Sequence, residues 1–292
     1  MDSTMHYRVK SRYVFGNVHD SFILHASIPA NKIYALLCQF RDKYPKETRN
    51  MKVLTVRNVD DDVHVGVDVM SDLSSDTKST LIDWLNTNYT DGKIWGIWQN
   101  IYPKSISVLS GLLYIMDYMD IDTARYNIPV GVGSFTTLNR STMTDTYNWI
   151  QARILLKDVV IIGRDITRSA YWFTHRSHNV VALAESDENY EDAIDSLKYN
   201  ESAPQFLRYG VTTPELKSYS KYCLVFNGRD FSRNAAAWLR YNKSYVDRVI
   251  VLTCKEYRIP PMEGWEITDT TFIDQQPGTD IIQQMNLYVK LH

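Results

Sequence analysis

Residues 158–185 read DVVIIGRDITRSAYWFTHRSHNVVALAE, and residues 222–255 follow the same plan as YCLVFNGRDFSRNAAAWLRYNKSYVDRVIVLTCK. Each segment begins with an apolar run that reaches Gly-Arg-Asp, then passes through a helical stretch into a second apolar run. The two turn glycines, Gly163 and Gly228, lie 228 − 163 = 65 residues apart. A strand, a turn, a helix and a second strand form a βαβ unit, so two copies predict a doubly wound, mostly parallel sheet. Such sheets bind ligands at the carboxyl ends of their strands, where both turns would lie.

The composition is that of an ordinary globular α/β protein. The chain has 292 residues, of which 44% are hydrophobic and 23% charged, a length that suits two domains. The net charge of −2 gives no general attraction for nucleic acid, so RNA binding would need a local basic patch. The cysteines Cys38, Cys223 and Cys254 form no close pair, which predicts neither a zinc site nor a disulfide framework and favours a reduced, cytoplasmic setting. The longest apolar stretch, 106–121, is interrupted and too short to span a bilayer, so no membrane partner is expected.

Residues 1–104 are predicted to form a ferredoxin-like α+β domain. Their patterns alternate in the order β-α-β-β-α-β, which is the split pattern of that fold. The expected elements are 21–28, 31–44, 51–59, 63–70, 74–86 and 93–101. Residues 105–146 are predicted to be a helical and irregular connector. The clustering of Leu109, Leu112, Leu113 and Met116 favours a helix at 105–118.

Residues 147–292 are predicted to form a Rossmann-like domain with five parallel strands and a terminal hairpin. Residues 155–292 resemble the class I S-adenosylmethionine-dependent methyltransferases. The resemblance is carried by the strand and turn DVVIIG, the helix TRSAYWFTHRSHN, the strand VVALAE with Glu185 at its end, and the closing hairpin. The first turn departs from the family, because it contains one glycine where the family has several.

This resemblance implies S-adenosylmethionine as the cofactor. In the family, the first turn holds the methionine end of the cofactor, which implies a role for Gly163 and Asp165. An acid at the end of the second strand binds the ribose hydroxyls, which implies Glu185. That residue follows Gly163 by 185 − 163 = 22 positions, close to the roughly 20 expected for a ribose-binding acid. A degenerate domain, retained for its surfaces, is the alternative.

The charged residues of the two turns have two interpretations. Asp165 and Asp230, or Thr167 and Ser232, could cap the helices that follow, with the arginines in solvent. Alternatively, the arginines surround one crevice and bind the phosphates of RNA or of a nucleotide, since guanidinium groups and helix N-termini both favour anions. The arginines in question are Arg164, Arg168, Arg229 and Arg233. Salt bridges between subunits would fit them equally well.

Two further patterns point to catalysis. The Lys-Asp-Lys-Glu arrangement of 2′-O-methyltransferases resembles the set Lys157, Asp230, Lys255 and Glu266, which makes Asp230 and Lys255 catalytic candidates. The spacing of this set is tight, and ordinary surface charge is the alternative. His25-Ala-Ser27 matches the His-x-Ser/Thr motif of two-histidine phosphoesterases, but a half-buried strand histidine is the simpler interpretation. No metal site is predicted.

The sequence therefore predicts a methyltransferase-like protein that acts on RNA. Low glycine (12 residues) beside high tyrosine (20 residues) suggests a viral source, and hence an mRNA-capping component in the host cytoplasm or the virion. The alternative is a non-enzymatic structural or assembly protein, such as a virion component with protein partners, that reuses α/β folds.

Overall fold

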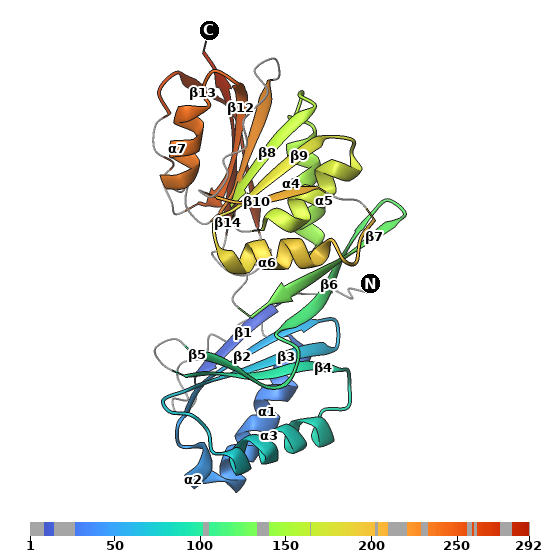
Figure 1. Ribbon diagram of the computed structural model, residues 1–292, viewed down its shortest axis with the longest axis vertical. Coiled ribbons are helices and arrows are strands. Elements are labelled where there is room, and N and C mark those ends of the chain that lie inside the picture. Colours follow the sequence, from blue (N-terminus) through green and yellow to red (C-terminus); the bar gives the residue numbers. More distant parts are fainter. Residues whose placement is uncertain are drawn as a thin grey trace. The chain divides into compact units, whose positions relative to one another are not determined.

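The chain divides into two compact units, Met1–Met116 and Asp117–His292 (Figure 1). The computed structural model describes residues 9–14, 27–101, 105–132, 140–163, 165–201, 204–209, 221–228, 233–255, 259, 262–274 and 282–291. Each unit has its own sheet, and in both units strands and helices alternate along the chain.

The first unit contains one mixed sheet with helices on one face. Its elements are β1 (Val9–Val14), α1 (Ile28–Lys43), α2 (Pro45–Thr48), β2 (Met51–Val59), β3 (Asp62–Val69), α3 (Ser75–Asn88), β4 (Ile94–Ile101) and β5 (Ser105–Gly111). The five described strands lie in the order β1-β2-β3-β4-β5. Strands β3 and β4 pair in parallel, and the other neighbours are antiparallel.

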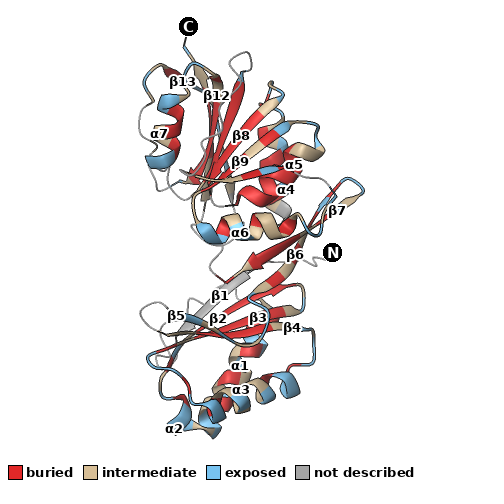
Figure 2. Ribbon diagram, viewed as in Figure 1, coloured by how far each residue is buried: buried red, intermediate tan, exposed pale blue. Residues whose placement is uncertain are grey.

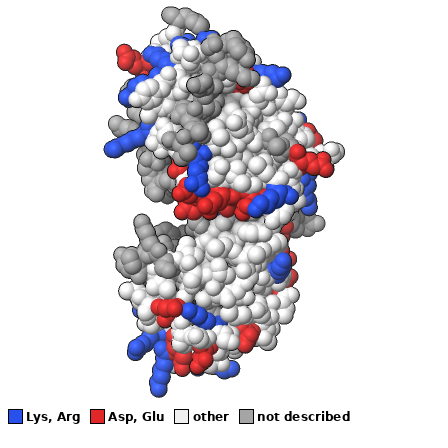
Figure 3. Space-filling model, in the orientation of Figure 1, with Lys and Arg blue, Asp and Glu red and all other residues white. Residues whose placement is uncertain are grey.

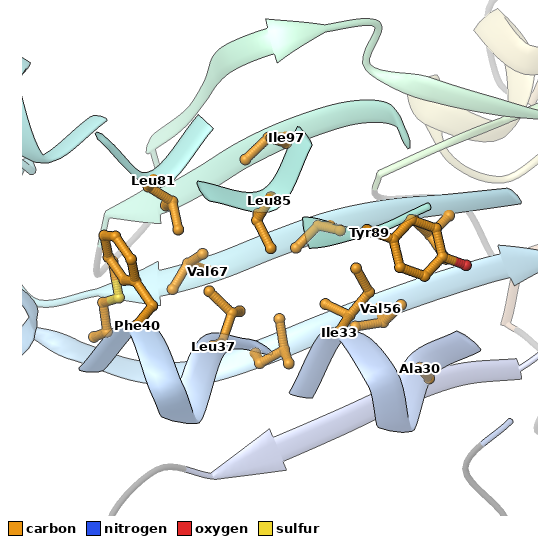
Figure 4. Close-up of a cluster of buried hydrophobic side chains, with 14 of the residues drawn as sticks. Ala30, Ile33, Leu37, Phe40, Val56, Val67, Leu81, Leu85, Tyr89 and Ile97 are labelled. Atoms are coloured by element: carbon orange, nitrogen blue, oxygen red, sulfur yellow. The ribbon is translucent and has the colours of Figure 1, made fainter. Parts of the chain in front are cut away.

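The core of this unit lies between the sheet and the helices α1 and α3 (Figure 4). Ile33, Leu37 and Phe40 recur at helical spacing along α1, and all three are fully buried. Leu81 and Leu85 of α3 lie on the same core. The sheet contributes Val56 of β2 and a row of valines on one face of β3, as period-two alternation requires, namely Val63, Val65, Val67 and Val69.

Both long helices of this unit begin at a serine cap. The Ser74 hydroxyl accepts a hydrogen bond from the Thr77 amide at 3.2 Å, and Ser27 does the same for Ala30. Each such cap contributes about 1 kcal/mol to helix stability. The hairpin between β2 and β3 turns at Asp60, whose φ of 53° is tolerated by a short polar side chain.

The strand order corrects the expected ferredoxin-like topology. That fold places its first strand between its third and fourth, whereas the strands observed for the third and fourth positions, β3 and β4, pair directly with each other. The expected first strand at 21–28 lies outside the described residues except for its end, where Ser27 caps α1 and Ile28 begins it. His25 also lies outside the described residues.

The predicted helix at 105–118 is wrong, because β5, β6 (Tyr114–Ile121) and β7 (Ala124–Gly131) run through this region. Along β6 every second residue is buried, namely Ile115, Asp117, Met119 and Ile121. The buried residues of β6 thus follow a period of two rather than 3.6. Strands β6 and β7 form a two-stranded sheet, so most of the expected irregular connector is strand, followed by α4 (Arg140–Gln151).

The second unit confirms the doubly wound sheet. Its further elements are β8 (Asp158–Gly163), α5 (Ile166–His175), β9 (Asn179–Ala184), α6 (Asp187–Ser196), β10 (Gln205–Arg208), β11 (Tyr222–Asn227), α7 (Arg233–Tyr241), β12 (Val246–Cys254), β13 (Trp265–Asp274) and β14 (Ile282–Lys290). Seven described strands lie in the order β10-β9-β8-β11-β12-β14-β13. The first five are parallel, and β14 is antiparallel to both of its neighbours. Ile161 of β8 pairs with Val225 of β11, so the two echoed segments share one sheet.

Helices cover both faces of this sheet (Figure 1). The residues Ala235, Trp238 and Leu239 of α7 pack against one face. Helix α5 packs on β8 and β9, and its residues from Ile166 to Phe173 are all buried. A helix that is buried on every side must be covered by more than a sheet. Figure 2 shows this burial along β8, β9 and the adjoining helix.

The β6–β7 hairpin supplies part of that cover. The rings of Tyr126 and Tyr171 stack with centroids 5.0 Å apart, which joins β7 to α5. The backbone of Asn127 exchanges two hydrogen bonds of 2.8 Å with the side chain of Asn200, beyond the end of α6. Arg176 forms a two-pronged contact with Asp122 in the turn of the hairpin. The hairpin is therefore fixed to the two helices by polar contacts as well as by packing.

Candidate functional site

The carboxyl ends of the five parallel strands meet at one edge of the sheet, which is the candidate site. Strands β9 and β10 extend the sheet on one side of β8, and β11 and β12 extend it on the other. The direction of winding therefore reverses between β8 and β11, and open α/β sheets bind ligands at such a reversal. Gly163 at the end of β8 pairs with Ala184 of β9 and with Asn227 of β11.

Gly163 is required by the packing of adjacent strands. Its φ is 144°, a conformation that other residues rarely adopt, and a Cβ there would lie 2.0 Å from the Asn227 carbonyl oxygen. No side chain fits at that distance from a backbone atom. The glycine thus allows β8 and β11 to approach closely at the edge where the sequence predicts the cofactor turn.

Asp165 and Arg168 belong to a buried ion network rather than to an open crevice. Arg168 donates to Asp165 through Nη1 at 3.0 Å and to Asp117 of β6 through Nη2. Arg168, Asp117 and Asp165 are 1%, 2% and 3% exposed. Burial alone would lower the pKa of Arg168, but the two carboxylates more than offset this and raise it above its usual range. The three residues carry a net charge of −1.

This network corrects two expectations from the sequence. Arg168 has no access to solvent, so it does not line a crevice for phosphate. Asp165 stands at the N-cap position of α5, but its side chain makes no capping hydrogen bond, because it faces Arg168 instead. The sequence contained one signal for this arrangement. Asp117 is an acid on the inward face of an alternating strand, which indicates a buried cationic partner.

Glu185 follows β9 directly and lies at the expected edge, half-buried. Tyr209 follows the neighbouring strand β10, and its amide donates to the Ala184 carbonyl at 3.0 Å. Burial raises the pKa of Tyr209, and the negative charge of Glu185 raises it further. The Tyr209 hydroxyl donates to the Asn234 carbonyl at 2.8 Å and fixes the ring. A carboxylate beside an oriented ring suits a nucleoside, since the acid can accept from both ribose hydroxyls.

The ends of β11 and β12 bring polar groups to the same edge. Asn227 is buried, and Thr253 is fully buried with a hydroxyl that has no hydrogen-bond partner in the part of the chain that the structure describes. Cys254 follows, half-buried. The sequence analysis did not identify any of these residues as site residues. The position of Cys254 at the end of an apolar run was a signal that could have identified it.

The Lys-Asp-Lys-Glu set is not assembled, which is a correction set by strand direction. Lys255 follows the carboxyl end of β12, where its Nζ lies 5.6 Å from the ring centroid of Phe272. Lys157 precedes β8, at the opposite edge of the parallel sheet. Glu266 pairs with Val289, which also pairs with Arg248 near the start of β12, so this acid lies toward the opposite edge too. The other catalytic candidate, Asp230, lies outside the described residues.

The structure describes only two of the four arginines expected to form a cluster, Arg168 and Arg233. Arg164 and Arg229 lie outside the described residues, and Arg233 is exposed at the start of α7. Beside this edge, the surface of α6 is acidic (Figure 3). Helix α6 carries five acids, namely Asp187, Glu188, Glu191, Asp192 and Asp195. Arg208 forms a salt bridge with Asp187 at 3.3 Å. This side of the edge would repel a phosphate backbone.

Comparisons with known proteins identify the fold. No protein-family model matches the chain, and no curated protein matches it. Among solved structures, the chain is similar to the Pyrococcus abyssi tRNA (uracil-54, C5)-methyltransferase in complex with S-adenosyl-L-homocysteine, with a TM-score of 0.63 and 13% identity over 89% of this chain and 67% of that one. A tRNA m1G37 methyltransferase from M. jannaschii matches with a TM-score of 0.45 and 11% identity over 88% and 78% of the two chains, which adds nothing to the assignment.

The chain has a class I S-adenosylmethionine-dependent methyltransferase-like fold. This confirms the resemblance drawn from the sequence and the Rossmann-like assignment. At 13% identity the likeness establishes the fold alone. No helix within the described ranges is long and apolar enough to cross a membrane.

Proposed function

We propose that the protein transfers a methyl group from S-adenosylmethionine to RNA. The observation that carries the proposal is the placement of Glu185 and Tyr209 directly after the paired strands β9 and β10, at the edge where the sheet reverses its winding. This is the place where a nucleoside cofactor binds in doubly wound sheets. The similarity to a tRNA methyltransferase that holds S-adenosyl-L-homocysteine supports the choice of cofactor and of RNA.

The residues at this edge fit the cofactor in both shape and charge. Glu185 would accept from the ribose hydroxyls, and Tyr209 would lie against the base that they carry. The cofactor has a net positive charge through its sulfonium and ammonium groups, and it supplies an electrophilic methyl group. The buried network of Asp117, Arg168 and Asp165 has a net charge of −1 at the first turn of α5, which favours a cation nearby. The unpartnered hydroxyl of Thr253 offers a further polar contact.

The acceptor atom is the second part of the proposal. The separation of Lys157 and Glu266 from Lys255 gives no support to a 2′-hydroxyl acceptor, and hence none to a capping role of that type. Cys254 lies at the carboxyl end of β12 and is a potential nucleophile. A thiolate that adds to a pyrimidine ring makes the neighbouring ring carbon reactive toward an electrophilic methyl group. After methyl transfer, loss of the proton from that carbon to a base would expel the thiolate and restore the ring double bond. We therefore favour a pyrimidine carbon as the acceptor.

Cofactor binding can be measured by thermal unfolding of the pure protein with S-adenosylmethionine. A ligand present at about 100 times its dissociation constant adds about 2.7 kcal/mol of stability, so a clear rise in Tm is expected. Glu185→Ala should lose most of this rise. Glu263→Ala is the matched control, because Glu263 is an exposed acid between β12 and β13. An unchanged Tm for the natural chain at millimolar cofactor contradicts the proposal.

A non-enzymatic assembly protein is the second candidate. It is favoured by the first turn of α5, where Asp165 and Arg168 are committed to the buried network. In that case the fold would serve as a scaffold, and neither S-adenosylmethionine nor S-adenosyl-L-homocysteine would change the unfolding temperature. Methyl transfer from labelled cofactor to a tRNA transcript would exclude this candidate.

A further inference from the structure

A pocket of about 270 Å³ lies in the first unit, at the corner between α1 and α2. Its lining consists of Cys38, Arg41, Asp42, Pro45, Thr48 and Arg49. It belongs to a different unit from the candidate cofactor site. The proposed function does not use any of these residues.

The corner is held by local hydrogen bonds and by aromatic packing. Tyr44 ends α1, and Pro45 begins α2 at a position where the ring of proline costs no helix hydrogen bond. The Thr48 hydroxyl and amide both donate to the Tyr44 carbonyl, at 2.6 and 3.1 Å. The ring of Phe40 packs against those of Tyr44 and Trp84, with centroids 4.9 and 6.0 Å apart. The pocket is therefore lined by a fixed backbone and does not depend on a loose loop.

The segment around this pocket is basic in a chain that is acidic overall. Residues 41–52 contain five Lys and Arg against two Asp and Glu, a balance of 5 − 2 = +3, whereas the whole chain carries −2. In the view of Figure 3, Lys and Arg side chains project at the end of the unit that carries α2. Such a local patch is what a protein without general positive charge needs in order to bind nucleic acid.

Helix stabilisation accounts for only part of this charge. Arg41 and Lys43 lie in the last turn of α1, where cations interact favourably with the helix dipole. Arg49 is the C-cap residue of α2, a helix of only four residues with a correspondingly small dipole, so helix stabilisation explains little of its charge, and Arg49 also lines the pocket. Within the described ranges, the exposed guanidinium of Arg49 has no carboxylate partner and no other hydrogen-bond acceptor.

We propose that the α1–α2 pocket binds a phosphate group of the RNA backbone, an inference that rests on the proposed function. Two guanidinium groups on one small pocket suit phosphate, because the planar fork of arginine matches phosphate oxygens in a two-pronged contact. A volume of about 270 Å³ suits a phosphate with its sugar rather than a paired helix. The acidic surface of α6 beside the cofactor edge makes a separate phosphate contact necessary.

The test is RNA binding by the double variant Arg41→Gln/Arg49→Gln, measured with a fluorescently labelled tRNA transcript. The control is Lys221→Gln/Arg240→Gln, which removes the same charge from exposed positions of the second unit. Between about 50 and about 200 mM salt, the slope of log Kd against log salt should fall by about 1 for each arginine removed. Affinity should fall about tenfold or more. The control should bind RNA as the natural chain does.

Three outcomes overturn the inference. They are an unchanged Kd and slope in the arginine variant, an equal loss in the control variant, and displacement of the RNA by polyglutamate rather than by inorganic phosphate. The Tm rise with S-adenosylmethionine, measured on the same samples, separates this inference from the proposed function. A variant that loses RNA binding but keeps the cofactor response supports both proposals. If the natural chain shows no Tm rise with the cofactor but binds RNA through these arginines, the proposed phosphate pocket is supported and the proposed methyltransferase function is contradicted.

Discussion

The guanidinium of Arg168 donates to the carboxylate of Asp117, a residue 51 positions earlier in the chain. The contact joins α5, which follows the first turn of the parallel sheet, to β6 of the hairpin. Both side chains are almost fully buried, and Asp165 takes the other end of the guanidinium. A residue that the sequence placed either in solvent or in an open crevice is therefore part of the buried interior.

Replacing Arg168 with methionine should destabilise the protein by about 3–5 kcal/mol, because two carboxylates would remain buried without a cation. The measurement is the urea midpoint of unfolding. The triple variant Asp117→Asn/Arg168→Met/Asp165→Asn carries no charge at the three positions and should recover part of the loss. If the single and triple variants unfold at the same urea concentration as the natural chain, the network is not formed.

Gly163→Ala should be more destabilising than Gly264→Ala. Both glycines have a positive φ, 144° and 80°, so both changes strain the backbone, at about 1–3 kcal/mol. The new Cβ at position 163 would also meet the Asn227 carbonyl at 2.0 Å, whereas at position 264 it meets the flexible end of Lys243 at 2.9 Å. Urea titration of the two variants provides the comparison. Equal losses would show that β8 and β11 do not approach so closely.

His64 should make the first unit sensitive to acid. Burial lowers the pKa of His64 to about 4, outweighing its hydrogen bond to the Leu112 carbonyl, and Arg57 lowers it further. The unfolded chain takes up this proton near pH 6.5, so the folded state loses stability as the pH falls from about 6.5 to about 4. The total is about 3 kcal/mol, and the contribution is fully present above pH 6.5.

The control for this prediction is His64→Gln, whose amide can still donate to Leu112. Urea unfolding at pH 7.5 and at pH 4.5 should show a smaller acid-induced loss in the variant than in the natural chain. Parallel losses in both chains would mean that the imidazole of His64 is protonated without penalty and that the acid response comes from other groups.

Cys254→Ala should abolish methyl transfer while leaving the Tm rise with S-adenosylmethionine unchanged, because the thiol is proposed to act on RNA and not on the cofactor. Cys223→Ala is the control in the same unit. Burial raises the pKa of Cys223 to about 12, so that thiol supplies no thiolate at neutral pH. Incorporation of label into a tRNA transcript is the readout. Full activity of the Cys254 variant would contradict a pyrimidine carbon as the methyl acceptor and would favour an oxygen or nitrogen atom.

The sequence by itself determined the parallel sheet of the second unit. The runs at 158–163 and 222–227 are apolar without alternation, as strands buried on both faces must be. Each run ends at a turn and leads into a helix, which fixes the crossover and hence the edge where Glu185 lies. A serine cap for α3 was also readable, at Ser74 or Ser75, since capping depends on residues three positions apart, and the structure places it at Ser74.

Only the tertiary structure decided which partners these elements meet. The region 105–121 has apolar residues that fit either period, and the pairing of β5 with β4 settles the choice in favour of strand. The strand order of the first unit, the burial of Arg168 against Asp117 and the contact of Gly163 with Asn227 all join residues distant in the chain. Local periodicity records which side of an element faces inward. It carries no information on what that side will face, because that depends on the packing of the whole unit.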